Sequence, residues 1–213
     1  NMIIKLAQEF GVKPHTLIHN TEGYKVADQM KESGAAGSLF ADWWGFKYEV
    51  YDAIPYNAAI LTKHDVLSCI HSDNAELARR LNQEAAKAVK YGGLSEVEAL
   101  KLVTLNPAKI LHLDGRMGSI KVGKDADLVL WTDNPLSIYA KAAKTFVDGI
   151  VYYDMEKDKE KFLEIEKERS RIIDKILAGG GAAKTGTEEK KPAVRVNEQF
   201  VYGDDDYSEY TKE

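Results

Sequence analysis

The residues best suited to chemistry stand where short apolar segments end. His19 follows the apolar run 16–18, and Asp73 follows the run 66–71. An imidazole can bind a metal ion or polarise a carbonyl group, and a carboxylate can bind a metal ion or take a proton from water. In parallel βα structures reactive side chains lie at the carboxyl ends of the strands, so both residues are candidates for one site.

Each candidate also has a structural interpretation. His19 can be a buried imidazole whose nitrogen is satisfied by a backbone carbonyl, and His15 is expected at the far end of the same strand. Asp73 precedes a helix expected over 75–91, and either Asp73 or Asn74 is a favoured N-cap. His71 alternates with Asp73 along its strand, so the two side chains can point the same way. The residue types alone leave these alternatives open.

Other catalytic signatures are missing from the sequence. We find no glycine-rich phosphate loop, no serine nucleophile elbow and no His-Glu-x-x-His pair. Cys69 is the single cysteine and lies inside an expected strand, so it is interpreted as a core residue rather than a nucleophile. The candidate chemistry therefore rests on histidine and carboxylate side chains.

Residues 1–110 alternate helical and strand-like patterns. Helical spacing recurs in 1–10, 23–33 and 75–91, and short apolar runs at 16–18, 35–40 and 66–71 predict strands. This alternation is typical of a parallel sheet built from βα units. Three strands cannot close a barrel, and both edges of such a sheet are expected to be unpaired, so something should complete it.

The pattern changes after residue 117. Segments 118–123 and 127–131 read as two short strands, and Asp148-Gly149 is a two-residue hairpin signal between apolar runs. A small antiparallel unit is expected here. Residues 155–178 follow as a charged helix with one apolar stripe, which either packs on a surface or binds a partner. Residues 179–213 read as a linker and an acidic tail, either solvated or docked on a neighbour.

Composition narrows the class of protein. The chain has 213 residues, 44% of them hydrophobic and 30% charged, with a net charge of −5. This acidity argues against nucleic acid as a partner, because phosphate binding needs a surplus of lysine and arginine. No apolar run approaches the roughly 20 residues that cross a bilayer, so no transmembrane segment is expected. The cellular compartment stays open, and the abrupt helical start at Asn1 suggests a fragment.

Two stretches carry a family resemblance. Thr104-Leu105-Asn106-Pro107-Ala108-Lys109, followed by Gly118-Ser119-Ile120 and Gly123-Lys124-Asp125-Ala126-Asp127-Leu128-Val129, strongly resembles the C-terminal end of the amidohydrolase superfamily. His19-Asn20-Thr21-Glu22-Gly23 and Asp42-Trp43-Trp44 are similar to its imidazolonepropionase-like branch. The resemblance covers about residues 1–154.

The resemblance implies a fold. The chain would be α/β, with residues 1–117 forming the last three βα units of a TIM-like (β/α)8 barrel. Residues 118–154 would be the returning strands of a small β-sandwich. The helix at 155–178 and the tail at 179–213 would be additions to this plan.

The resemblance also implies an activity. It suggests the C-terminal part of a metal-dependent amidohydrolase, in which metal-activated water hydrolyses a C–N bond in a cyclic amide, a peptide or a related compound. His19 and Asp73 match metal ligands of strands six and eight, and Asp73 also matches the general base. The cofactor would be a divalent metal ion, with zinc as the expected element. Trp43, Trp44 and His71 are expected near the substrate, although the tryptophans can equally cap the core.

The family's other ligands have no counterpart in this sequence. A His-x-His pair, a carbamylated lysine or glutamate and a strand-five histidine would all precede Asn1. We therefore expect the missing N-terminal half of the barrel as a partner, an oligomeric protein and an inactive isolated chain. The alternative is a catalytically incomplete fragment or subunit with a scaffold or binding role.

Overall fold

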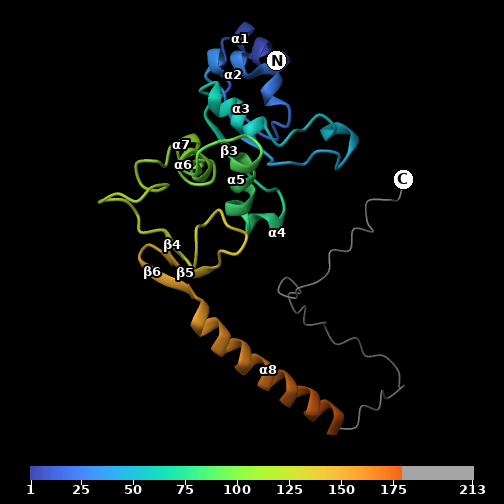
Figure 1. Ribbon diagram of the computed structural model, residues 1–213, viewed down its shortest axis with the longest axis vertical. Helices are drawn as coiled ribbons and strands as arrows, with labels where there is room; N and C mark the ends of the chain where they lie inside the picture. The colour runs from blue at the N-terminus through green and yellow to red at the C-terminus, as the bar shows by residue number, and fades with distance from the viewer. Residues whose placement is uncertain (179–213) are drawn as a thin grey trace. The chain divides into compact units, whose positions relative to one another are not determined.

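A computed structural model describes residues 1–178 (Figure 1). The chain divides into two units between Ile165 and Glu166, and the described part of the second unit is residues 166–178. The predicted linker and acidic tail at 179–213 lie outside the described residues. The predicted boundaries at 117 and 154 stay predictions.

Three parallel strands organise the first unit. They are β1 (Thr16–Leu17), β2 (Ala36–Leu39) and β3 (Ser68–Ile70), in the spatial order β1-β2-β3. Thr16 is in register with Ala36, and Gly37 is in register with Ser68. This arrangement confirms the predicted parallel sheet. β1 is shorter than expected, because the chain leaves the ladder before Ile18, whose side chain is 67% exposed.

Helices connect and cover these strands. They are α1 (Met2–Glu9), η1 (Gly23–Val26), α2 (Ala27–Ser33), η2 (Tyr48–Val50), α3 (Asn57–Lys63), α4 (Ala75–Ala78), α5 (Leu81–Lys90), α6 (Glu96–Lys101) and α7 (Leu105–Ile110). α2 ends where predicted, because Gly34 adopts a left-handed conformation with φ 71° that favours glycine.

The single helix predicted over 75–91 is wrong. α4 ends at Ala78 and α5 begins at Leu81, with Arg80 at φ −123° between them. The break coincides with a tertiary contact, because Asn82 Nδ2 donates a hydrogen bond to the Pro135 carbonyl oxygen at 2.6 Å. Helix propensity does not register a partner so distant in sequence.

The core lies between the sheet and its helices. Ile4, Met30, Leu39, Leu61 and Leu102 are each at most 2% exposed. Burying a side chain of this size contributes about 1.5–3 kcal/mol. Cys69 is 6% exposed, and burial raises the pKa of its thiol while a hydrogen bond to Ser38 opposes that shift. The thiol therefore belongs to the packed interior.

The two edges of the sheet differ. The Ile70 N–H donates to the Leu102 carbonyl at 2.9 Å, and Asn106 Nδ2 donates to the Ser68 carbonyl at 2.9 Å. The expectation that both edges are bare is therefore wrong for β3, because the α6–α7 junction occupies part of its outer edge. Within residues 1–178, β1 pairs with β2 alone.

An antiparallel sheet follows. It contains β4 (Leu128–Trp131), β5 (Ala142–Val147) and β6 (Ile150–Asp154) in that order. Asp148 and Gly149 have φ angles of 50° and 78° between paired Val147 and Ile150, which confirms the predicted hairpin.

The predicted strand at 118–123 does not form. Lys124 folds back over this segment, and its Nζ bonds the Ser119 hydroxyl at 2.8 Å and the Met117 carbonyl at 3.1 Å, in addition to the Asp114 carbonyl. These bonds hold the segment as a series of turns instead of a strand.

α8 (Met155–Ala178) is the predicted charged helix (Figure 1). Its apolar stripe is exposed and consists of Phe162, Ile165, Ile172, Ile173 and Ile176. Among the described residues, no helix combines the length and the apolar character needed to cross a membrane.

A partly buried charge cluster joins α5 to the segment after β2. Glu84 is 4% exposed, and Lys87 Nζ lies 2.9 Å from Glu84 Oε1 and 2.8 Å from Asp42 Oδ1. Burial lowers the pKa of the Lys87 ammonium, but the hydrogen bonds to Asp42 and Glu84 outweigh it, so the pKa is raised. The lysine therefore carries the charge that the buried carboxylate needs.

We predict that Lys87→Met lowers the free energy of unfolding by about 3 kcal/mol, because it leaves the Glu84 carboxylate buried without its cation. The double variant Lys87→Met/Glu84→Gln should regain part of this loss, since neither charge remains. Urea denaturation followed by circular dichroism measures both. Lys90→Met, at an exposed position of the same helix, is the control and should change stability by less than about 0.5 kcal/mol. A Lys87→Met variant as stable as this control would contradict the prediction.

Candidate functional site

β1 and β3 bring the two predicted metal ligands to the same rim of the sheet. His19 Nε2 lies 3.5 Å from Asp73 Oδ2, and both side chains are more than half exposed. The two residues follow the carboxyl ends of strands that flank β2 on opposite sides. The convergence is thus a product of the parallel sheet, and the chemical roles of the two residues stay predictions.

The backbone turns sharply at both residues. His19 has φ 55° and Asp73 has φ 51°, in the left-handed region that few residues other than glycine adopt. Such conformations cost roughly 1–3 kcal/mol each and cluster at functional sites. The surrounding hydrogen bonds must hold them in place.

The N-cap of α4 is Asn74. Its Oδ1 accepts hydrogen bonds from the N–H groups of Glu76 at 2.9 Å and Leu77 at 3.0 Å. Of the two capping residues that the sequence allowed, Asn74 takes the role. The structural interpretation of Asp73 as N-cap is therefore wrong, and its carboxylate instead faces His19.

His71 is held in one orientation. Its Nδ1 lies 2.8 Å from the Leu39 carbonyl oxygen, so this nitrogen must carry the proton. Burial lowers the pKa of His71, the nearby His19 adds to this effect and Asp73 opposes it, and a lowered pKa favours the neutral ring. Nε2 is then an acceptor, and it is buried without a hydrogen-bond partner in the structure of residues 1–178. A buried polar atom without a partner calls for an explanation, such as a bound group.

A stack of rings lines the rim. Phe40 lies against His71 with ring centroids 4.3 Å apart, against His19 at 5.3 Å and against Trp43 at 4.1 Å. Phe40 is 9% exposed, whereas Trp44 is 67% exposed. Of the two predicted substrate tryptophans, only Trp43 therefore packs into this wall. Sequence analysis did not single out Phe40, although its place at the end of an apolar run was the available signal.

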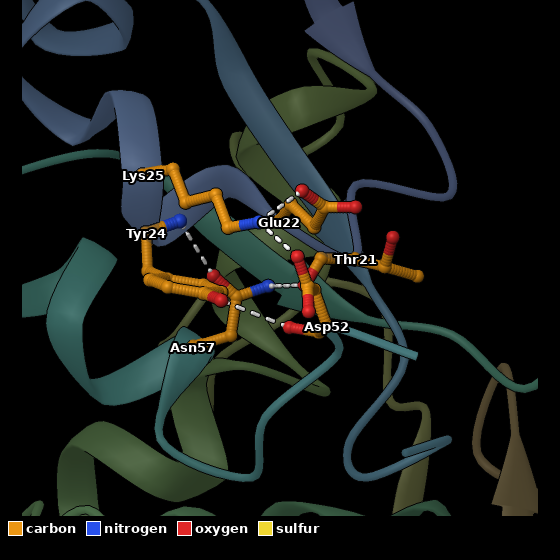
Figure 2. Close-up of polar contacts among 6 residues, drawn as sticks. All are labelled: Thr21, Glu22, Tyr24, Lys25, Asp52 and Asn57. Carbon is orange, nitrogen blue, oxygen red and sulfur yellow. Dashed lines mark hydrogen bonds and ion pairs between the residues drawn. The ribbon is translucent and has the colours of Figure 1, made fainter. Parts of the chain in front are cut away.

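Asn57 anchors the turn that follows His19. Its Nδ2 donates hydrogen bonds to the Asn20 carbonyl at 2.8 Å and to the Thr21 carbonyl at 3.2 Å. Figure 2 shows the amide directed at Thr21 and Tyr24 of this turn. Its Oδ1 accepts a hydrogen bond from the Tyr24 N–H at 2.9 Å. Sequence analysis missed this residue, because an asparagine at the start of a helical segment has no motif that reveals so distant a partner.

The donor set fits a divalent metal ion in part. Imidazole nitrogen and carboxylate oxygen are zinc ligands, and two ligands of one tetrahedral zinc ion lie about 3.4 Å apart. The 3.5 Å between His19 Nε2 and Asp73 Oδ2 matches that spacing. No group of three or more histidine, cysteine or carboxylate side chains suited to a metal occurs in the described part of the chain. These residues therefore fit two positions of a coordination sphere.

A cavity of about 740 Å³ lies elsewhere, between α5 and the segment after β4. Its lining includes Arg80, Glu84, Asn134 and Ile138, and neither His19 nor Asp73 contributes to it. The candidate site is the open rim of the parallel sheet, not this cavity.

Known proteins resemble the chain over part of their length. It is 36% identical over 118 residues to the amidohydrolase tasK of Hapsidospora irregularis, covering 55% of this chain and 12% of that protein. It is 32% identical over 111 residues to imidazolonepropionase of Pseudomonas aeruginosa strain UCBPP-PA14, covering 51% of this chain and 28% of that protein. The chain thus spans less than a third of these curated relatives.

A solved structure shows the same relation. The crystal structure of an amidohydrolase from Thermotoga maritima MSB8 superposes with a TM-score of 0.66 at 33% identity, covering 71% of this chain and 40% of that one. Residues 51–158, half of this chain, match the profile of the amidohydrolase family. The fold, the motifs and these matches agree, and the chain belongs to the amidohydrolase family.

Proposed function

We propose that this chain is the C-terminal part of a metal-dependent amidohydrolase barrel. Residues 1–117 supply its last three βα units, and residues 118–154 supply returning strands of a small β-sandwich. The order β1-β2-β3 supports this proposal, since it puts His19 and Asp73 on the first and third of three neighbouring strands. The family implies the same spacing for ligands of strands six and eight.

The proposed reaction is hydrolysis of a C–N bond in a cyclic amide, a peptide or a related compound. The observation that carries it is the 3.5 Å separation of His19 Nε2 and Asp73 Oδ2. These two side chains would hold a divalent ion, for which we propose zinc. When bound, such an ion activates water and polarises the substrate carbonyl. Asp73 takes a proton from the attacking water and passes it to the leaving nitrogen.

The ring stack provides the substrate wall. His71 Nε2 is an acceptor without a donor, and the N–H of an amide substrate is the kind of donor that it lacks. Trp43 extends the wall through its contact with Phe40, and the exposed Trp44 offers a further aromatic surface. This arrangement favours a planar amide-containing substrate.

The partner that we propose is the missing N-terminal half of the barrel, on the same or a separate chain. Within residues 1–178 the outer edge of β1 has no pairing strand, and α1 with its C-cap residue exposes Met2, Leu6 and Phe10 close to it in sequence. A strand and helices added there would bury these groups. We propose an oligomeric protein for the same reason, because the exposed groups at β1 and α1 need further protein to cover them.

A second candidate role is that of a catalytically incomplete subunit with a scaffold or binding function. It is favoured by the two converging donors, since a zinc site needs three or four protein ligands or their equivalents. The enzyme role and the scaffold role differ in whether the complete protein binds zinc and needs it for activity.

We predict that the isolated chain, dialysed against zinc and analysed by elemental analysis, retains well below one equivalent. The complete protein should retain zinc stoichiometrically and lose its activity to a chelator. One zinc ion per isolated chain would contradict the two-ligand interpretation. A complete protein that hydrolyses amides at an unchanged rate after the metal is removed would contradict the enzyme proposal.

We also predict that substitutions at the neighbouring residues Asn74 and Asp73 affect different properties, stability in the first case and catalytic rate in the second. Asn74→Ala should lower the free energy of unfolding by about 1 kcal/mol, because it removes the cap of α4. Asp73→Asn should change stability little, since asparagine tolerates the left-handed backbone. In the complete protein, however, it should lower kcat by about 10²–10⁴-fold through loss of the base. Urea denaturation and steady-state kinetics separate the two effects, and an active Asp73→Asn enzyme would exclude Asp73 as the base.

A further inference from the structure

Asn57 is the most completely bonded buried polar side chain near the site. It is 2% exposed at the start of α3, and its amide makes three hydrogen bonds to backbone groups of Asn20, Thr21 and Tyr24. Figure 2 shows those to Thr21 and Tyr24. The amide uses both its donor and its acceptor atoms in these contacts. An aspartate of the same shape would instead turn a carboxylate oxygen toward two carbonyl oxygens. The position therefore requires an amide.

The backbone that Asn57 binds begins one residue after His19. The Asn20 N–H donates to the Ser38 carbonyl at 3.0 Å, and the Thr21 N–H donates to the His19 carbonyl at 2.9 Å. The left-handed turn at His19 is thus fixed by β2 on one side and by Asn57 on the other. Without the amide, two carbonyls and one N–H of this turn would lose their partner.

The same turn is tied to the aromatic segment 41–56. The Tyr24 hydroxyl donates to the Asp52 carbonyl at 2.9 Å, and Lys25 pairs with Glu22 at 2.7 Å and with the Asp52 carboxylate (Figure 2). Exposed ion pairs contribute little, at most about 1 kcal/mol, so the buried amide is the stronger part of this connection. Asn57 directly follows the segment that carries Trp43 and Trp44.

We propose that Asn57 is a positioning residue that sets the His19 imidazole at the rim and keeps the aromatic segment aligned with it. This proposal rests on the proposed function of His19 as a metal ligand. Asn57 acts through the backbone of residues 20–24 and touches no reacting atom. Groups that orient a metal ligand commonly change metal affinity by 10–100-fold when they are removed.

The test compares Asn57→Ala with Thr62→Ala. Thr62 lies on the same helix and donates its hydroxyl hydrogen bond to the Ala58 carbonyl at 2.8 Å, away from the His19 turn. NMR of the metal-free isolated chain follows the His19 ring resonance, assigned by its disappearance in His19→Asn. Zinc affinity is measured on the complete protein, and urea midpoints give the stability of each variant.

We expect Asn57→Ala to shift the His19 ring resonance and to weaken zinc binding by about 10-fold or more. Thr62→Ala should leave both at the wild-type values even though it lowers the urea midpoint. If Asn57→Ala lowers the midpoint but leaves the His19 resonance and the zinc affinity unchanged, its role is structural only and the proposal is overturned.

Two further variants keep the outcomes distinct. Asn57→Ser retains one donor and one acceptor, so it should fold if Asn57→Ala does not, and it should show a smaller shift of the same kind. If His19→Asn binds zinc as tightly as the wild type, the proposed function of His19 fails. The His19 ring shift in Asn57→Ala then still decides whether Asn57 positions that ring.

Discussion

The pairing of β2 with a parallel neighbour on each side is the constraint on which this molecule depends. Because all three strands run in one direction, their carboxyl ends share one rim. The register that aligns Gly37 with Ser68 sets the height at which Phe40 meets His71. A reversal of any one strand would carry its side chains to the opposite end of the sheet. The contact between His19 and Asp73 is therefore a consequence of topology before it is a feature of either residue.

Side-chain amides hold the backbone at the carboxyl ends of β1 and β3 in a strained, left-handed conformation. An amide side chain donates hydrogen bonds to, or accepts them from, the backbone that follows each left-handed turn, Asn57 after His19 and Asn74 after Asp73. The hydrogen bonds offset the backbone cost and restrict how either turn can relax. Asn57 and Asn74 thus serve the same physical purpose at two strand ends, although one reaches across the fold and the other caps the next helix.

Features that depend on contacts between residues close in sequence could be predicted, and features that depend on distant contacts could not. The parallel sheet, the Asp148-Gly149 hairpin and α8 depend on short patterns and could be predicted, as could the candidate pair of His19 and Asp73. The break between α4 and α5 and the turns at 118–123 depend on single side chains that reach distant or locally folded backbone. Asn57 lies 33 to 37 residues from its partners, so no local pattern could identify it. The choice between Asp73 and Asn74 as the cap could not be made from the sequence, because both residue types favour the position.

The unequal edges of the sheet constrain how a barrel could be completed. At β1 a new strand can add directly, since the described residues leave that side without a pairing strand. At β3 the Ile70 N–H already donates to Leu102, and this group has a single hydrogen to give. Any strand added on this side would have to compete with the Leu102 carbonyl for that hydrogen. Leu102 is fully buried in the core, so the α6–α7 junction is a stable cover that protects this edge from unwanted strand pairing.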